Sequence, residues 1–438
     1  MSSFNKSIKV FGGVSLLTGI IVGSGIFFVG SLVLDVLNYS TGFALVAWLI
    51  GGLLTLSYAW MYAHVGAHNP KVGGYYAYLK DAYGPLVGFM AGFFNFVLAS
   101  SGSIAVLALA FSEVSHNILM TAFGNGLESW MQITLAAVMI VLLTGMNILG
   151  IKLNTTFLKV IMVVKFIPIL ALILIGFTIG SQPFQLSFDL GGVGFFEGLS
   201  LIGFAVIFTF WAYEGWTNLN AVTEEMENPA RDLPKALTIT IALVIAVYVL
   251  YQGSLFRALD PATIEGIVGS GFLFIGIPAT MALVGDFGVY IVMGTIFIAI
   301  LGALNATILS FSRVYFAVAK DYPSLKPLAT LDEKRQTPVR ALILTGLMAL
   351  VLVFFRIADL ISLVAFGGLV FNTLVFYSIF KLQKEEGVFK TPLYPYLPAV
   401  SIGITLLLLV AIFIQNPVTS LIGVAVIGVS IPVYQLIK

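Results

Sequence analysis

The sequence predicts an all-α integral membrane protein. Of its 438 residues, 59% are apolar and only 9% are charged, against roughly 25% charged residues in a soluble protein. Too few charges remain to cover a soluble surface, and the high hydrophobicity excludes disorder. Apolar stretches recur along the chain, each close to the ~20 residues with which a helix crosses a bilayer. A β-barrel would instead show alternating segments of about 10 residues.

Twelve apolar stretches are predicted to be transmembrane helices. They lie at about 11–36, 41–66, 86–117, 131–149, 157–181, 195–226, 236–256, 287–318, 338–355, 358–382, 394–414 and 416–436. The first follows two lysines, as a signal peptide would, but it is too long and contains no cleavage site after a short core. Because no gap between spans could hold a soluble domain, residues 1–438 are expected to form one transmembrane domain.

The basic residues predict the topology. With a cytoplasmic N-terminus, all but three of the 21 lysines and arginines fall on cytoplasmic segments or helix ends. Arg257 and Arg356 fall outside, and Lys165 lies within a span. This asymmetry follows the positive-inside rule. An even number of spans then predicts a multi-pass protein of the plasma membrane with both termini cytoplasmic.

Composition also argues against several functions. The net charge of +1 and the lack of a basic tract give no reason to expect a nucleic-acid partner. No cysteine is available for disulfides, thiolate catalysis or metal binding. His64, His68 and His116 are too scattered for a convincing metal site, and no phosphate-loop, zinc-protease or serine-hydrolase motif occurs. We therefore expect no enzyme activity, no cofactor and no metal.

The first span contains a predicted helix break. Residues 19–27 read GIIVGSGIF, so Gly23 and Gly25 flank Ser24 near the middle of the membrane. Glycine lets the backbone leave helical geometry cheaply, and unwound backbone at that depth is tolerated only where it lines a cavity within the protein. The alternative is a small-residue face for helix packing.

The sixth span contains a second predicted break. Residues 210–218 read FWAYEGWTN, which places Glu214 and a glycine among four aromatic residues. An interfacial aromatic belt is the weaker explanation, because about 15 apolar residues precede the cluster. The helix is expected to continue to Glu224, with Pro229 and Pro234 ending it. The break therefore lies near the midplane.

The two breaks lie five spans apart, and an odd repeat inverts the second copy relative to the first. Paired interruptions in corresponding positions of two halves indicate the binding site of a transporter. A half-helix N-terminus offers free N–H groups and a positive dipole end to an anion, while unwound carbonyls attract a cation. An amino acid, as a zwitterion, would satisfy both.

Four motifs carry a family resemblance. They are GSGIF at 23–27, PKVGGYYAY at 70–78, AYEGW at 212–216 followed by TEEMENPARDLP at 223–234, and SRVYFAVAKD at 312–321. With these motifs in this order, the chain resembles the L-type amino acid transporter family of the amino acid–polyamine–organocation superfamily. The resemblance implies a leucine-transporter-like fold with inverted five-helix repeats of about 8–181 and 194–382 and extra helices at about 394–436. It also implies alternating access.

The resemblance implies specific substrate contacts as well. The substrate carboxylate would meet backbone N–H groups of Ser24, Gly25 and Ile26, and the ammonium would meet carbonyls of Ile21, Trp211 and Glu214. Gly23 and Tyr213 complete the expected substrate-binding set. Members linked to a heavy subunit use a cysteine between spans three and four. That segment has none here, so a single chain without a disulfide-linked ancillary subunit is expected.

Lys165 is the candidate coupling residue. A charge at its depth costs roughly 2.5–3.5 kcal/mol on insertion scales, so it needs a partner or a role. Family members with this lysine place its ammonium where sodium-coupled relatives bind sodium, which implies sodium-independent transport. Its ammonium is then expected to bond carbonyls near residues 19–23. The alternative is a lysine that reaches the cytoplasmic surface.

Glu214 is the candidate selectivity residue. Protonated or braced by neighbours, it would narrow the pocket and favour small neutral amino acids such as alanine or serine. Ionised and unpaired, it would favour dibasic amino acids or polyamines. The sequence thus predicts sodium-independent exchange of small neutral amino acids, with dibasic transport as the alternative. A hypothesis from another functional class is a membrane receptor that binds an amino acid without transporting it.

Overall fold

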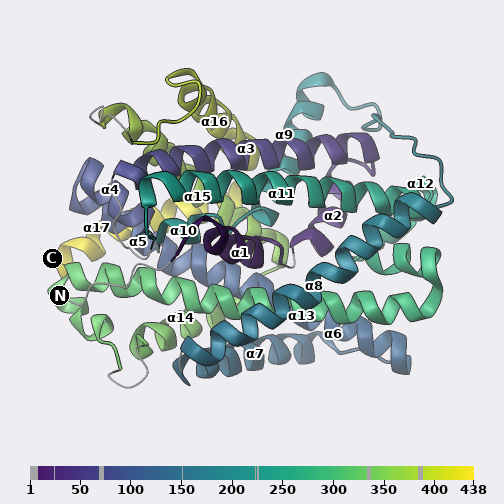
Figure 1. Cartoon of the computed structure of the whole chain (residues 1–438), viewed down its shortest axis with the longest axis horizontal. Helices are drawn as coiled ribbons and strands as arrows, with labels where there is room; N and C mark the ends of the chain where they lie inside the picture. Colours follow the sequence, from purple (N-terminus) through teal and green to yellow (C-terminus); the bar gives the residue numbers. More distant parts are fainter. Residues whose placement is uncertain are drawn as a thin grey trace.

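The computed structural model describes residues 8–23, 25–68, 74–149, 151–221, 223, 226–332, 337–382 and 388–438. This part of the chain is helical. Its only bridge is an isolated pair, Ile8 with Met226, and it contains no strand. Most helices run along the long axis of the molecule, side by side (Figure 1).

The helices follow one another with short connections. In order they are α1 (Val10–Ile21), α2 (Gly25–Val36), α3 (Thr41–His68), α4 (Tyr75–Tyr83), α5 (Pro85–Phe94), the π-helix η1 (Asn95–Ser100), α6 (Ser101–Phe123), α7 (Ser129–Leu149), α8 (Ile151–Ile179), α9 (Phe195–Ala212), α10 (Thr217–Ala221), α11 (Pro229–Ala258), α12 (Pro261–Gly269), α13 (Gly276–Asp321), the 3₁₀-helix η3 (Pro323–Ala329), α14 (Val339–Leu352), α15 (Ile357–Ser378), the 3₁₀-helix η4 (Ile379–Lys381), α16 (Tyr396–Gln415) and α17 (Pro417–Ile437).

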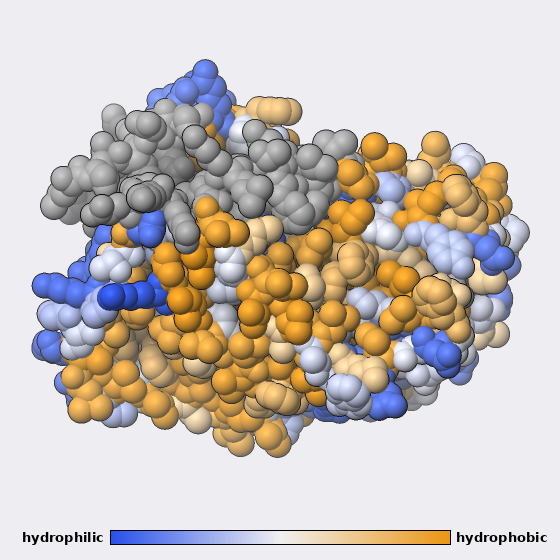
Figure 2. Space-filling model, turned by 90° about the horizontal axis from the view of Figure 1, so that it is seen from below, coloured by the Kyte–Doolittle hydropathy of each residue, from blue (hydrophilic) through white to orange (hydrophobic). Residues whose placement is uncertain are grey.

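The multi-pass helical class is confirmed. Within the described residues, nine helices are long and apolar enough to cross a membrane, or ten if α1 and α2, which meet at a bend of 51°, form one span. Two other predicted spans correspond to shorter apolar helices, residues 164–179 and α14. Figure 2 shows hydrophobic residues over the middle of one face and hydrophilic residues toward its two ends, as expected for a bilayer-spanning protein.

One expectation about the sixth and seventh spans was wrong. After the second break α10 follows, with five residues; the predicted end of this helix at Glu224 lies outside the described residues. Pro229 and Pro234 do not end a helix. Pro229 occupies the first turn of α11, where its missing N–H costs no hydrogen bond, and Pro234 lies inside that helix.

Long-range packing brings the two breaks to the centre of the bundle. α2 contacts α9, while α1 and α3 contact α11. At one end of the bundle the Asp321 carboxylate binds Lys80 Nζ at 2.7 Å and accepts from the Tyr76 hydroxyl at 2.6 Å. These contacts tie α4 to α13. Ser324 Oγ donates to Ile437 O at 3.3 Å, so α17 ends beside η3 at this same end (Figure 1).

Candidate functional site

The first break is a tight turn between α1 and α2. Gly23 N donates to Ile21 O at 2.7 Å, whereas helical geometry would pair it with Gly19 O. A Cβ at Gly25 would lie 2.8 Å from the Ala212 Cα, so only glycine allows α2 to approach α9 this closely. Ser24 lies outside the described residues.

The second break is the turn from Tyr213 to Trp216. Glu214 N donates to Trp211 O at 3.0 Å. Gly215 has a φ of 119°, a conformation that residues with a Cβ rarely adopt. A Cβ there would also lie 2.8 Å from Ile20 Cγ2. The two breaks therefore pack against each other, and both contacts require glycine.

Tyr248 of α11 connects the two breaks. Its hydroxyl lies 2.7 Å from Ile21 O and 3.1 Å from Ala212 O, so it can donate to the last carbonyl of either half-helix. Helix ends leave such carbonyls without intrahelical partners. The sequence carried no signal for this role, because a tyrosine in an apolar span is usually a packing residue.

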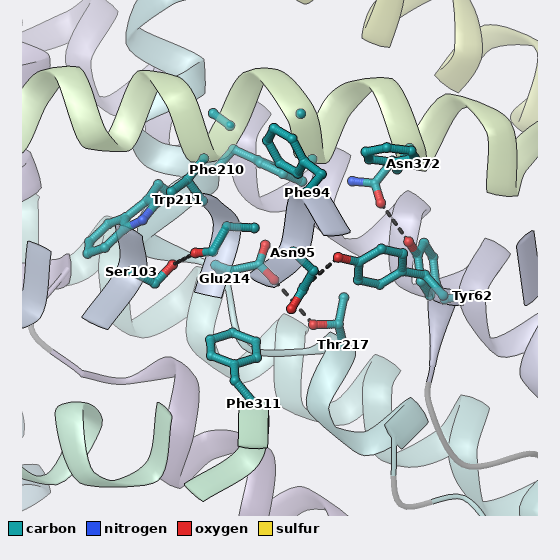
Figure 3. A pocket seen from close by; sticks show the side chains of 17 residues that line it. Tyr62, Phe94, Asn95, Ser103, Phe210, Trp211, Glu214, Thr217, Phe311 and Asn372 are labelled. Atoms are coloured by element: carbon teal, nitrogen blue, oxygen red, sulfur yellow. Dashed lines mark hydrogen bonds between the residues drawn. The ribbon is translucent and has the colours of Figure 1, made fainter. Parts of the chain in front are cut away.

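Two cavities meet at the breaks. One has a volume of about 80 Å³ and the other of about 60 Å³. They share four lining residues, Ser103, Trp211, Glu214 and Phe311. In Figure 3, Glu214 lies between Trp211 and Ser103 on one side and the hydrogen-bonded pair Tyr62 and Asn372 on the other.

Most of the predicted substrate-binding residues line the smaller cavity. Its lining includes Ile21, Gly23, Gly25, Trp211 and Glu214, together with Asn218 and Thr307, which the sequence analysis missed.

Ile26 and Tyr213 line neither cavity. Ile26 is buried, and its carbonyl accepts from Gln252 Nε2 at 3.2 Å. The Tyr213 side chain points to α3, where its hydroxyl donates to Trp48 O at 3.1 Å. Tyr213 thus braces the second break from behind.

The wall shared by the two cavities presents polar groups that can form further hydrogen bonds. Glu214 Oε1 accepts from Thr217 Oγ1 at 3.3 Å, and within the described residues no ion pair involves Glu214. The buried Trp211 Nε1 has no hydrogen-bond partner among the described protein groups. Because buried polar groups normally find partners, this wall is suited to a polar ligand.

The π-helix η1 shapes the other side of the larger cavity. It interrupts the third span between α5 and α6 and directs Asn95 to the cavity, where the Asn95 amide bonds the Tyr75 hydroxyl. Ser103, in the first turn of α6, lines both cavities, and its Oγ donates to Ala99 O at 2.8 Å. Single-turn π-helices are frequent at functional sites. No local sequence pattern predicted the π-helix η1.

Lys165 reaches the first break from α8. Its side chain is 1% exposed, and Nζ donates to Gly19 O at 2.6 Å. The turn at Gly23 leaves this carbonyl without its usual helical donor, so the ammonium takes the place of a missing N–H. The structure therefore contains a hydrogen bond of the kind expected from the sequence. The coupling role of Lys165 stays a prediction.

These features define a class of protein. A multi-pass helical membrane protein with two broken helices around an internal cavity has the architecture of a membrane transporter. The chain matches the amino acid permease family over residues 8–434, and it belongs to that family. The predicted resemblance is thereby confirmed.

Three relatives cover nearly the whole chain. It is 30% identical to the serine/threonine exchanger SteT of Bacillus subtilis (strain 168), over 100% of this chain and 98% of the relative. It is 28% identical to b(0,+)-type amino acid transporter 1 of Mus musculus, over 95% and 84%. It is 29% identical to large neutral amino acids transporter small subunit 2 of Homo sapiens, over 99% and 81%.

Proposed function

We propose that this protein is a secondary transporter that exchanges L-amino acids across the plasma membrane by alternating access. The observation that carries the proposal is the convergence of the α1–α2 and α9–α10 breaks on one cavity. Such broken helices can change their relative tilt while their unwound residues hold substrate. Family membership and the names of the relatives support amino acids as the substrate class.

The finer architecture belongs to the same proposal. We infer twelve transmembrane helices, built as inverted repeats of about 8–181 and 194–382 with extra helices at about 394–436. Both termini would face the cytoplasm, in keeping with the distribution of lysine and arginine. The chain has no cysteine that could link it to a second subunit, which supports a single-chain transporter. One relative is named a small subunit, so purification from the native membrane is the direct test of this point.

The substrate would lie across the two breaks. Its carboxylate would bind N–H groups of Ser24, Gly25 and Ile26 at the positive end of α2. Its ammonium would bind carbonyls of Ile21, Trp211 and Glu214. Ile21 O already accepts from Gly23 N and lies beside the Tyr248 hydroxyl. Substrate would therefore share or displace the contact with Tyr248.

Small neutral amino acids are the preferred substrates in this proposal. Glu214 accepts from a neutral threonine hydroxyl, and phenylalanine and tryptophan side chains fill much of the surrounding wall. SteT is a serine/threonine exchanger, which agrees with this choice. Dibasic substrates are the second candidate, because a side-chain amine could supply the positive partner that no described residue gives Glu214.

Transport would not depend on sodium. The Lys165 ammonium binds the Gly19 carbonyl that the break releases. A positive charge is thus already fixed beside the first break, where a bound cation would otherwise neutralise the exposed carbonyls.

Uptake into proteoliposomes tests the proposal. Vesicles loaded with serine should accumulate labelled serine or alanine faster than empty vesicles, with saturation and without a sodium gradient. Saturable binding without flux would instead support the receptor, and current proportional to voltage would support a channel. Strong exchange of lysine but not of serine would favour the dibasic alternative.

A further inference from the structure

A second, apolar recess lies away from the broken helices. It has a volume of about 150 Å³ and lies between α5, η1, α13, η3, α14 and α17. Phe93, Phe96, Leu344 and Ile437 are among the half-buried side chains that line it. α17 contacts α5 and η3, and η3 contacts α13 and α14. The recess, here called the η3 groove, therefore lies at the end of the bundle where α4 and α17 end (Figure 1).

The η3 groove opens beside exposed basic side chains. Lys326 lies between the lining residues Leu325 and Leu328, and Lys438 follows Ile437. Arg340 precedes Leu344 by one helical turn, and its guanidinium donates to Pro327 O of η3 at 3.3 Å. Three separate elements thus carry an exposed basic residue next to, or one turn from, a residue that lines the apolar groove.

In the described elements that line the groove, acidic side chains are fewer than basic ones. Within α5, η1, η3, α14 and α17 there is no aspartate or glutamate. α13 contributes Asp321 at this end, and Lys80 and Tyr76 already bind its carboxylate. Asp332, beyond η3, is engaged in an interaction of its own. The described elements around the groove therefore combine an apolar interior with a rim richer in basic than in acidic side chains.

The floor of the groove is the outer side of the cavity wall. The rings of Phe96 and Tyr315 pack edge to face at 5.1 Å, and the Tyr315 hydroxyl donates to Asn95 O at 3.4 Å. Asn95 lines the larger cavity from the other side. An occupant of the groove would pack against the π-helix that shapes this cavity.

We infer that the η3 groove binds one molecule of anionic phospholipid, with an acyl chain in the groove and the phosphate between Lys326, Arg340 and Lys438. Hydrocarbon would cover the apolar lining, and basic side chains at the membrane surface attract anionic headgroups. A zwitterionic lipid fits the same lining but gains less from the rim, because its headgroup carries no net charge.

Native mass spectrometry of the purified full-length protein tests this inference. Protein is equilibrated in micelles containing equal amounts of phosphatidylglycerol and phosphatidylcholine. Wild type should retain one phosphatidylglycerol in preference to phosphatidylcholine. Lys326→Gln/Arg340→Gln/Lys438→Gln should weaken that binding about 100-fold, because three headgroup contacts are lost. Excess soluble glycerol phosphate should not displace the lipid, since it lacks the acyl chains.

A matched control removes the same number of charges elsewhere. Lys235→Gln/Lys320→Gln/Lys390→Gln changes exposed lysines that do not line the groove, and it should bind phosphatidylglycerol as wild type does. Leu344→Trp fills the groove and should abolish retention while leaving the rim charges in place. Equal retention of both lipids by wild type, or unchanged phosphatidylglycerol binding in the rim variant, would overturn the inference. So would a second copy of the chain covering the groove.

Discussion

The two helix breaks perform related tasks but are stabilised differently. At the first break, side chains from distant parts of the chain bind the released carbonyls. Lys165 binds Gly19 O from 146 residues away, and Tyr248 lies beside Ile21 O from 227 residues away. At the second break, neighbours in sequence do most of the bonding. Glu214 N donates to Trp211 O, and Asn218 donates to Gly215 O at 2.8 Å.

We propose that this difference separates a coupling role at the first break from a selectivity role at the second. A break held by distant helices loses its support when those helices move, so the first break is suited to link substrate binding to a conformational change. A locally bonded break keeps its shape and can hold Glu214 at a constant position in the cavity. The predictions below test this division of roles.

The largest effect is expected for Gly25→Leu, which should reduce exchange to background. The added Cβ would lie 2.8 Å from the Ala212 Cα, and a backbone atom cannot move aside as a flexible side chain can. Uptake into proteoliposomes measures the loss. Gly403→Leu is the control, since Gly403 is exposed on α16 with no atom close to its Cβ position. Wild-type uptake by Gly25→Leu would mean that substrate binds elsewhere.

Lys165→Ala should slow exchange by about 10- to 100-fold. This rate change corresponds to the free energy of a buried hydrogen bond from a charged donor. Substrate affinity should change far less, because the lysine contacts the break rather than the cavity. Stopped-flow exchange and equilibrium binding separate the two quantities. Lys235→Ala, an exposed lysine of α11, serves as the control. Normal exchange rates in Lys165→Ala would show that Lys165 has no coupling role.

Glu214→Gly should alter specificity by roughly tenfold, as changes in pocket volume typically do. In wild type, alanine and serine should compete with labelled substrate better than lysine or ornithine. The glycine variant should admit larger apolar amino acids. A competition panel on both proteins measures this. The opposite pattern, with strong inhibition by lysine that disappears in Glu214→Gly, would favour the dibasic alternative.

Tyr248→Phe should have a smaller effect, a loss of exchange of about two- to tenfold, in line with a net 0.5–1.5 kcal/mol for a neutral hydrogen bond. Only the hydroxyl is removed, so the ring keeps its contacts with Trp48 and Tyr213. A melting temperature close to wild type would show that packing is intact. An unchanged exchange rate would show that the Tyr248 hydroxyl does not link the two breaks during transport.

Replacing sodium with choline or potassium should leave the initial uptake rate unchanged within about twofold, because the Lys165 ammonium provides the buried positive charge. The measurement is uptake at a constant total salt concentration. A clear dependence on the sodium gradient would contradict this account of Lys165. A bound ion would then have to stabilise the first break in the comparison between the two breaks.

The place of the breaks could be predicted from local sequence, but apart from the bond of Lys165 their contacts could not. Gly23, Gly25 and Gly215 stand out because glycine in an apolar span is a local signal with a backbone meaning. Tyr248, Asn95 and the π-helix η1 carry no such signal. Their roles depend on which helices become neighbours, and no short stretch of sequence records that.

The sequence by itself determined the membrane class, the approximate spans and the two points at which helices unwind, because hydropathy and glycine content act within a single segment. Tertiary structure alone decided that Tyr213 turns away from the cavity toward Trp48, while Glu214 beside it faces the cavity. For Lys165, the family resemblance implied a carbonyl partner near residues 19–23, and the tertiary structure decided that this partner is the Gly19 carbonyl. Adjacent side chains at a break take different directions, and packing of the neighbouring helices selects which one reaches the site.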